Sequence, residues 1–294
     1  MAVMLGSVEA NLRPGRRLEV YALDDGIQPQ DAGKVRASVG DRVAIHWLKA
    51  EKEKLAGLPV WGRISATTYL KLTLGEWLPP HVERALWLDC DLLVTADIAT
   101  LWEMSMEGLP ALAAQDQRVP LVSSRFGVQG YAELGLDPAA MYFNAGVMLI
   151  DVDGWRKLEV AARALDYLKQ YRDKVYFWDQ EALNAVLAGR WGLLDGRWNW
   201  HPSLSHLRKV EQREPWILHF SGNLKPWECE GSSMHYGLYR FYLDQTAWSG
   251  WRPVSNWQGR MARMYEQSLL RRWIYPLEQA GTRILRAMTK RYSA

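Results

Sequence analysis

Residues 84–94 read RALWLDCDLLV, an apolar run that carries two carboxylates one residue apart. Such a run is typical of a buried parallel strand. Because alternate residues of a strand point to the same face, we expect Asp89 and Asp91 to aim at one hard cation, with Cys90 as a small apolar residue on the other face. Ligands gather at the carboxyl ends of strands in open α/β sheets. The stretch therefore predicts a divalent-ion site beside a charged substrate such as a nucleotide diphosphate.

A second pair of carboxylates, Asp151 and Asp153, follows the apolar residues 146–150 and precedes Gly154. The same spacing allows a metal site here, but Asp and Gly at this point also favour a plain turn. A strand-end turn is the alternative for Asp89 and Asp91 as well, so spacing alone leaves both interpretations open.

The composition favours a single catalytic domain in a reducing compartment. A chain of 294 residues can bury one substantial core, and Cys90 and Cys229 are too few for a disulfide framework. The first residues are too short an apolar run for a secretory leader, and no transmembrane helix is predicted. A net charge of +3 argues against general nucleic-acid binding. The sixteen tryptophans fit either sugar stacking or ordinary core packing.

The C-terminal end has a different pattern, with basic and apolar residues interleaved beyond Gly259 and a break near Pro276. This predicts basic amphipathic helices that dock on an anionic membrane surface, although a packed terminal helix with a solvated basic face gives the same pattern. A turn near Trp248 places the boundary. We expect a catalytic domain over 1–247 and a membrane-associating region over 248–294, on a cytoplasmic protein held at the inner face of the plasma membrane.

Hydrophobic periodicity and breakers predict alternating strands and helices, which implies a mostly parallel α/β sheet. The expected strands are 18–23, 42–47, 84–94, 109–114 and 145–150, and the expected helices are 2–12, 30–39, 65–72, 155–171 and 179–187.

Four separated blocks resemble the retaining family-8 glycosyltransferases, most closely the bacterial lipopolysaccharide galactosyl- and glucosyltransferases. The blocks are LDCD at 88–91, YFNAGV at 142–147, WDQEALN at 178–184 and HFSGNLKPW at 219–227. The resemblance implies a GT-A type, Rossmann-like nucleotide-sugar-binding domain. It also implies a donor, UDP-galactose or UDP-glucose, held through Mn²⁺ or Mg²⁺, and a lipopolysaccharide core or other glycan as acceptor.

The resemblance also implies roles for individual residues. Asp89, Asp91 and His219 match the metal ligands, a set that leaves positions open for diphosphate oxygens. Without the resemblance, His219 is a satisfied strand-end histidine and Lys225 a surface lysine. The positions that match the donor site are Lys71 and Lys225 for the diphosphate, Gly222 for close backbone approach, Asn144, Ala145 and Gly146 along the sugar, and Asp116 near the hydroxyls.

Asp179 and Gln180 match the pair at the reacting face of the sugar. An uncharged amide is a poor nucleophile, so we expect same-face substitution in which Gln180 stabilises an oxocarbenium-like state and Asp179 binds sugar hydroxyls. Without the resemblance, Asp179 is an acid in the first turn of a helix and Gln180 is a surface residue.

The chain departs from the family in two places. The usual first strand, with its Asp-Asp turn for uracil and ribose, has no match ahead of residues 1–12, so either the start codon lies further upstream or the chain is crippled. The otherwise intact site favours the first explanation. Lys71 stands where many relatives carry an Arg, which keeps the charge but loses the bidentate fork. Two alternatives stay open: a sugar-binding pseudoenzyme, and a haloacid-dehalogenase-like phosphatase that uses Asp151.

Overall fold

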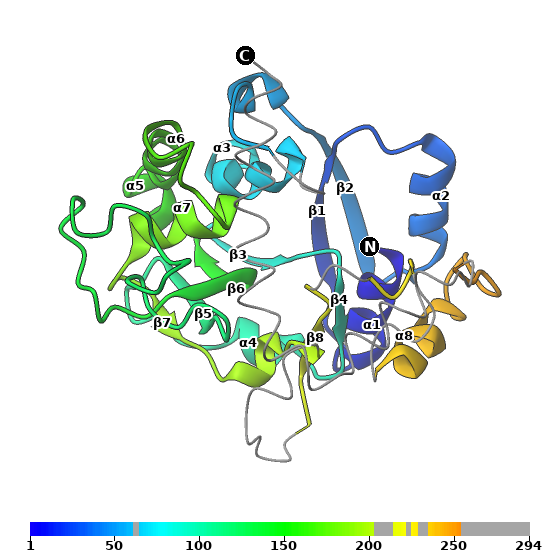
Figure 1. Ribbon diagram of the computed structural model, residues 1–294. Coiled ribbons are helices and arrows are strands. Elements are labelled where there is room, and N and C mark those ends of the chain that lie inside the picture. The colour runs from blue at the N-terminus through cyan, green and yellow to red at the C-terminus, as the bar shows by residue number, and fades with distance from the viewer. Residues whose placement is uncertain (61–64, 203–213, 222–224, 229–234, 254–294) are drawn as a thin grey trace.

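The computed structural model describes residues 1–60, 65–202, 214–221, 225–228 and 235–253 (Figure 1). The strands are β1 Leu18–Asp24, β2 Val43–Lys49, β3 Arg84–Leu88, β4 Leu92–Val94, β5 Ala111–Gln115, β6 Phe143–Asp151, β7 Gly192–Leu193 and β8 Ile217–His219. The α-helices are α1 Ala2–Asn11, α2 Pro29–Ala37, α3 Leu74–Trp77, α4 Ile98–Trp102, α5 Val152–Lys157, α6 Val160–Gln170, α7 Trp178–Leu187 and α8 Tyr236–Leu243. The 3₁₀ helices are η1 Lys52–Leu55, η2 Ala66–Thr73 and η3 Gly196–Asn199.

The described strands form three hydrogen-bonded groups of mixed direction, so the expectation of a mostly parallel sheet is wrong. β1 and β2 are parallel, β4 and β8 are antiparallel, and the central group has the order β3-β6-β5-β7. In that group β6 lies antiparallel to both β3 and β5, and only the β5–β7 pair is parallel. The reason is the connection over 116–142, which brings the chain back beside β5 without a crossover helix. Antiparallel neighbours do not need one.

The stretch 84–94 is two strands and not one. The last backbone bond to β6 is made by Asp89 N–H, which donates to Gly146 O (2.9 Å) just after the end of β3. Two residues later Asp91 O accepts from Phe220 N–H (2.9 Å), next to β8. The chain therefore changes its pairing partner across residues 89–91. Cys90 lies exposed in this turn, which contradicts its expected place on a buried strand face.

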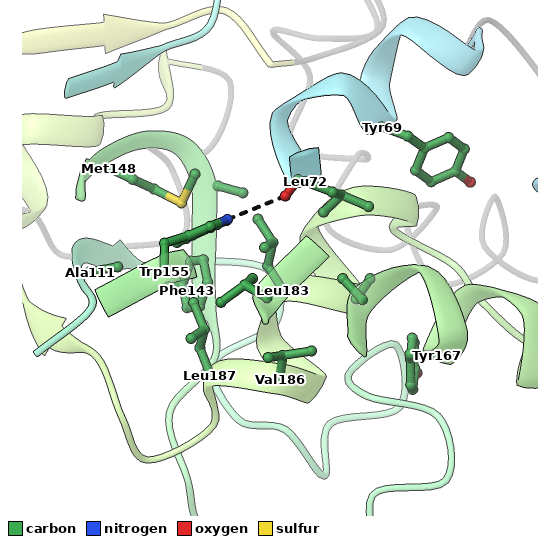
Figure 2. Packing of buried hydrophobic residues seen from close by; sticks show 14 of the residues in the cluster. Tyr69, Leu72, Ala111, Phe143, Met148, Trp155, Tyr167, Leu183, Val186 and Leu187 are labelled. Atoms are coloured by element: carbon green, nitrogen blue, oxygen red, sulfur yellow. Dashed lines mark hydrogen bonds between the residues drawn. The ribbon is translucent and has the colours of Figure 1, made fainter. Parts of the chain in front are cut away.

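The main core is formed by side chains of α5, α6 and α7 together with side chains of β6 (Figure 2). Trp155 is 1% exposed, and its indole Nε1–H donates to Leu72 O at the end of η2 (3.2 Å). The single helix expected over 155–171 is two helices, because Glu159 between them has a left-handed φ of 50°. The helix expected over 65–72 is the 3₁₀ helix η2. Among these elements α5 and α7 contact β6, and η2 packs against α6 and α7.

Three further expectations concern the ends of the fold. Among the described strands β1 pairs only with β2 and β3 only with β6, and the missing first strand stays a prediction. The boundary after residue 247 also stays a prediction, since the basic helices expected in the tail fall in 254–294, outside the described residues. Within the described chain, no helix has both the length and the hydropathy needed to span a bilayer.

Candidate active site

Three polar side chains converge where β3 gives way to β4. One ligand atom from each of Asp89, Asp91 and His219 lies within 4.8 Å of those of the other two. His219 ends β8, whose register places it opposite Leu92, so the two short strands bring the imidazole to the Asp-x-Asp turn. His219 Nε2 lies 3.4 Å from Asp91 Oδ1. Two carboxylates and one imidazole form an oxygen-rich ligand set that suits a divalent cation such as Mn²⁺ or Mg²⁺.

Cations of the protein itself already stabilise the charge on Asp91. Lys225 Nζ donates to Asp91 Oδ2 (2.6 Å) and to Phe220 O (2.7 Å). Burial by itself would raise the pKa of the Asp91 carboxyl, but His219 and Lys225 outweigh it and hold the pKa well below its ordinary value. Lys225 therefore lies beside the expected metal ligands, as its expected role at the diphosphate requires. Gly222 falls in 222–224, outside the described residues.

Gly146 leaves room for the His219 ring. A Cβ at position 146 would lie 2.2 Å from His219 Cε1 and 2.7 Å from His219 Nδ1, well inside van der Waals contact. The backbone at Gly146 has no left-handed φ, so the requirement for glycine comes from the ring and not from the dihedral angles. Gly146 is thereby linked to the candidate metal site, in addition to its expected place along the donor sugar.

Lys71 lies between two carboxylates instead of facing open solvent. Its Nζ is 3.1 Å from Asp89 Oδ1, 2.8 Å from Asp179 Oδ2 and 3.2 Å from Ala145 O, and its side chain is 7% exposed. Burial alone would lower the pKa of the ammonium, but Asp179 and Asp89 outweigh it and hold the pKa above its ordinary value. Lys71 therefore joins the candidate metal site to the first turn of α7, and its expected contact with a diphosphate stays a prediction.

The remaining predicted residues form one hydrogen-bonded group. Gln180 Nε2 donates to Asp116 Oδ2 (3.1 Å), and Gln180 Oε1 accepts from Ala145 N–H (3.2 Å). Asn144 Nδ2 donates to the same Asp116 oxygen (2.9 Å), while Asn144 Oδ1 accepts from Gly146 N–H (3.0 Å). Every predicted site residue that the structure describes thus lies in this cluster or in direct contact with it.

The second carboxylate pair has a structural role. Asp151 caps α5, since its side chain accepts from Gly154 N–H (3.0 Å), and Asp153 pairs with Arg156 one turn later (3.3 Å). This is the turn that the sequence offered as the alternative to a metal site. The structure therefore gives Asp151 a capping role and supplies no observation that favours the phosphatase interpretation.

Sequence reasoning missed Asn199 and His201, and it gave Thr68 only a structural place in the run that includes Lys71. His219 Nδ1 is bonded to Asn199 Oδ1 (2.8 Å), and the His201 ring packs beside the His219 ring at a tilt of 38°, with centroids 4.8 Å apart. Thr68 Oγ1 donates to Asp179 Oδ1 (3.0 Å). Residues 195–202 read DGRWNWHP, and the one signal available there was a run of polar side chains set among tryptophans.

The α/β architecture and this cluster define a glycosyltransferase of the GT-A type. The fold matches a crystal structure of an active-site glutamine-to-glutamate variant of LgtC with a TM-score of 0.73 and 25% identity, over 88% of this chain and 94% of that one. It also matches the galactosyltransferase LgtC in complex with donor and acceptor sugar analogues, with a TM-score of 0.72 and 25% identity, over 89% and 94%.

The chain belongs to glycosyltransferase family 8, whose family model matches residues 1–231. Among curated proteins, General stress protein A of Bacillus subtilis strain 168 is 26% identical over 84% of this chain and 89% of its own length. The family resemblance predicted from the four sequence blocks is therefore confirmed.

Proposed function

We propose that this protein is a metal-dependent, retaining hexosyltransferase that moves galactose or glucose from a UDP-sugar to a glycan. The observation that carries the proposal is the convergence of Asp89, Asp91 and His219 with Lys225 at the turn between β3 and β4. The likeness to LgtC with bound donor and acceptor sugar analogues supports a sugar donor and a sugar acceptor here.

Asp89, Asp91 and His219 would hold the cation, for which we favour Mn²⁺ over Mg²⁺ because an imidazole joins the carboxylates. When bound, the cation supplies positive charge to the diphosphate of the leaving group. Lys225 is the protein's own contribution to the same charge. The Lys225 ammonium bonds Asp91 and the backbone oxygen of Phe220. This positive charge stabilises the negative charge that develops on UDP as the sugar–phosphate bond breaks.

The environment of Gln180 supports substitution on one face of the sugar. Both ends of its amide are engaged, the oxygen by Ala145 N–H and the nitrogen by Asp116, so the side chain is held in one orientation. An amide oxygen that already accepts a hydrogen bond is a weak nucleophile, but it is well suited to stabilise an oxocarbenium-like state. Asp179 is held by Lys71 and Thr68 and is assigned to sugar hydroxyls.

The acceptor and the location are part of the proposal. We place the acceptor among lipopolysaccharide cores or other glycans at the inner face of the bacterial membrane, with the basic residues beyond Gly259 as the membrane contact. The names of curated relatives range from Bacillus subtilis General stress protein A to a probable galacturonosyltransferase-like protein of Arabidopsis thaliana, so they leave the acceptor open.

Release of UDP from UDP-galactose and UDP-glucose tests the proposal. The purified chain is expected to release UDP with Mn²⁺ but not with EDTA, and Asp91→Ala is expected to abolish release. Asp153→Ala is the matched control, because it removes a carboxylate from the other Asp-x-Asp pair, which caps and stabilises α5. Release at the wild-type rate by Asp91→Ala would overturn the metal assignment. A folded wild-type protein that binds glycan and releases no UDP would favour the pseudoenzyme.

The stereochemical part has its own test. Mass spectrometry of the protein incubated with donor is expected to show no covalent sugar adduct on Gln180, Asp179 or any other residue. A trapped glycosyl-enzyme would replace same-face substitution with a double displacement.

A further inference from the structure

A buried chain of hydrogen bonds runs from Asp116 to the candidate metal ligand His219. Asn144 Nδ2 donates to Asp116 Oδ2 (2.9 Å), Asn199 Nδ2 donates to Asn144 Oδ1 (2.9 Å), and Asn199 Oδ1 is bonded to His219 Nδ1 (2.8 Å). All four side chains are buried, the most exposed being Asn144 at 7%. Since these polar groups are shielded from water, each must find its hydrogen-bond partner within the protein.

The direction of every bond in this chain follows from its first member. An ionised carboxylate can only accept, so Asn144 must present its NH₂ to Asp116 and turn its oxygen towards Asn199. Asn199 must then present its NH₂ to Asn144 and its oxygen to His219. The backbone gives an independent check, because Gly146 N–H, which can only donate, is bonded to Asn144 Oδ1 (3.0 Å). The orientation of the Asn144 amide is thus determined by a fixed acceptor, Asp116, and a fixed donor, Gly146 N–H, and it in turn determines the orientation of Asn199.

This direction decides which nitrogen of His219 carries a proton. An acceptor at Asn199 Oδ1 requires N–H at Nδ1, which leaves the lone pair of a neutral imidazole on Nε2. Nε2 is the nitrogen that faces Asp91 Oδ1 at 3.4 Å. Without a metal, a proton on Nε2 can face Asp91 Oδ1, which agrees with the effect of His219 on the Asp91 pKa. A bound cation would take the place of that proton, and the neutral ring would then present its Nε2 lone pair to the metal.

The same carboxylate also orients Gln180. Its Nε2 donates to Asp116 Oδ2 (3.1 Å), so its oxygen must face Ala145 N–H (3.2 Å), as it does. Asp116 therefore orients the Gln180 amide directly and determines the tautomer of His219 through Asn144 and Asn199.

We propose that Asn199 is a positioning residue that holds His219 in the Nδ1–H form, with Nε2 directed at the metal. The inference rests on the proposed function in one respect, the assignment of His219 as a metal ligand. Partners on the far nitrogen of a ligating histidine fix its tautomer and ring orientation, and their loss typically weakens metal binding about 10–100-fold.

Two substitutions at Asn199 test this by direct Mn²⁺ binding, measured by electron paramagnetic resonance of the free ion. Asn199→Leu keeps the branching at Cγ and removes the acceptor, and it is expected to weaken Mn²⁺ binding about 10–100-fold. Asn199→Asp keeps an acceptor for Nδ1–H but loses the donor to Asn144 Oδ1, which still accepts from Gly146 N–H. Mn²⁺ affinity is therefore expected to recover to within a few-fold of wild type. Asn11→Leu is the control, since the amide of Asn11 donates to Ser7 O, Val94 O and Tyr242 Oη and to no residue of the candidate site. The Mn²⁺ affinity of this variant is expected to equal that of wild type.

Unchanged Mn²⁺ affinity in a folded Asn199→Leu protein would overturn the proposal, and so would equal losses in the Leu and Asp variants, which indicate a packing role. If Asn199→Leu fails to fold, the imidazole ¹⁵N spectrum of metal-free wild type decides, with His219→Gln used for assignment. In the neutral ring the proton is expected on Nδ1, and a neutral ring with a bare Nδ1 and a protonated Nε2 refutes the inference. A wild-type protein with protonated Nδ1 that binds no Mn²⁺ would instead refute the metal assignment alone.

Discussion

Replacing Gly146 with alanine would place a methyl group inside the volume of the His219 ring. The added Cβ would lie 2.2 Å from Cε1, whereas ordinary carbon contacts are about 3.5–4.0 Å, so the ring must retreat by more than about 1 Å. The His219 ring has little room to move, because it is 4% exposed, bonded to Asn199 at 2.8 Å and packed against the His201 ring.

Overpacking of this kind typically costs about 1–3 kcal/mol of folding free energy. A displacement of about 1 Å at a catalytic group can cost about 10²-fold in rate. We expect Gly146→Ala to lower the urea midpoint, to weaken Mn²⁺ binding at least about tenfold and to reduce UDP release about 100-fold.

Gly33→Ala is the matched control. Gly33 lies inside α2, a Cβ there meets nothing within 4 Å, and the φ is not left-handed, so alanine is expected to stabilise the helix by about 1 kcal/mol and leave Mn²⁺ affinity unchanged. Wild-type Mn²⁺ affinity and midpoint in Gly146→Ala would refute the steric argument.

Three other substitutions have distinct expected outcomes. Lys71→Met leaves the carboxylates of Asp89 and Asp179 without their shared cation and should cost about 3–5 kcal/mol in urea unfolding; an unchanged midpoint would show that the ion pairs are dispensable. Burial raises the pKa of Glu181 to about 6 against its ordinary 4.5. The folded state then binds the proton more tightly than the unfolded state, so stability should fall by about 2 kcal/mol as the pH rises through this window. Glu181→Gln should remove that part of the pH dependence, and an identical pH profile would contradict the assignment. Asp151→Ala should cost about 1 kcal/mol as a lost helix cap while UDP release per folded molecule stays at the wild-type level; loss of release would place Asp151 in the chemistry.

Much of the fold could be predicted because its signals are local. The apolar run over residues 146–150 and the amphipathic helix that begins near Asp179 both identify their elements within a few residues. The change of partner at residues 89–91 could not be predicted, because it depends on β6 and β8, which lie far along the chain and pair with the residues on either side of this turn. The same is true of sheet direction, which is set by the connection over 116–142.

The candidate site divides in the same way. Asp89 and Asp91 are readable from their spacing, and His219, Asn144 and Gln180 from the family blocks. Asn199 belongs to no such block, and its importance comes only from contacts made at separations of 20 and 55 residues. A sequence pattern can indicate a ligand, but it does not show which buried amide orients that ligand.

Four residues in the first turns of α7 contact other parts of the chain. Asp179 reaches Lys71, Gln180 reaches Asp116, Glu181 accepts from Gln129 N–H, and Asn184 pairs with both backbone groups of Phe143. A helix held at so many points cannot loosen one contact at a time. Its amide protons should therefore exchange with solvent as one cooperative group, and an event that frees any one of these side chains should speed exchange along the whole helix.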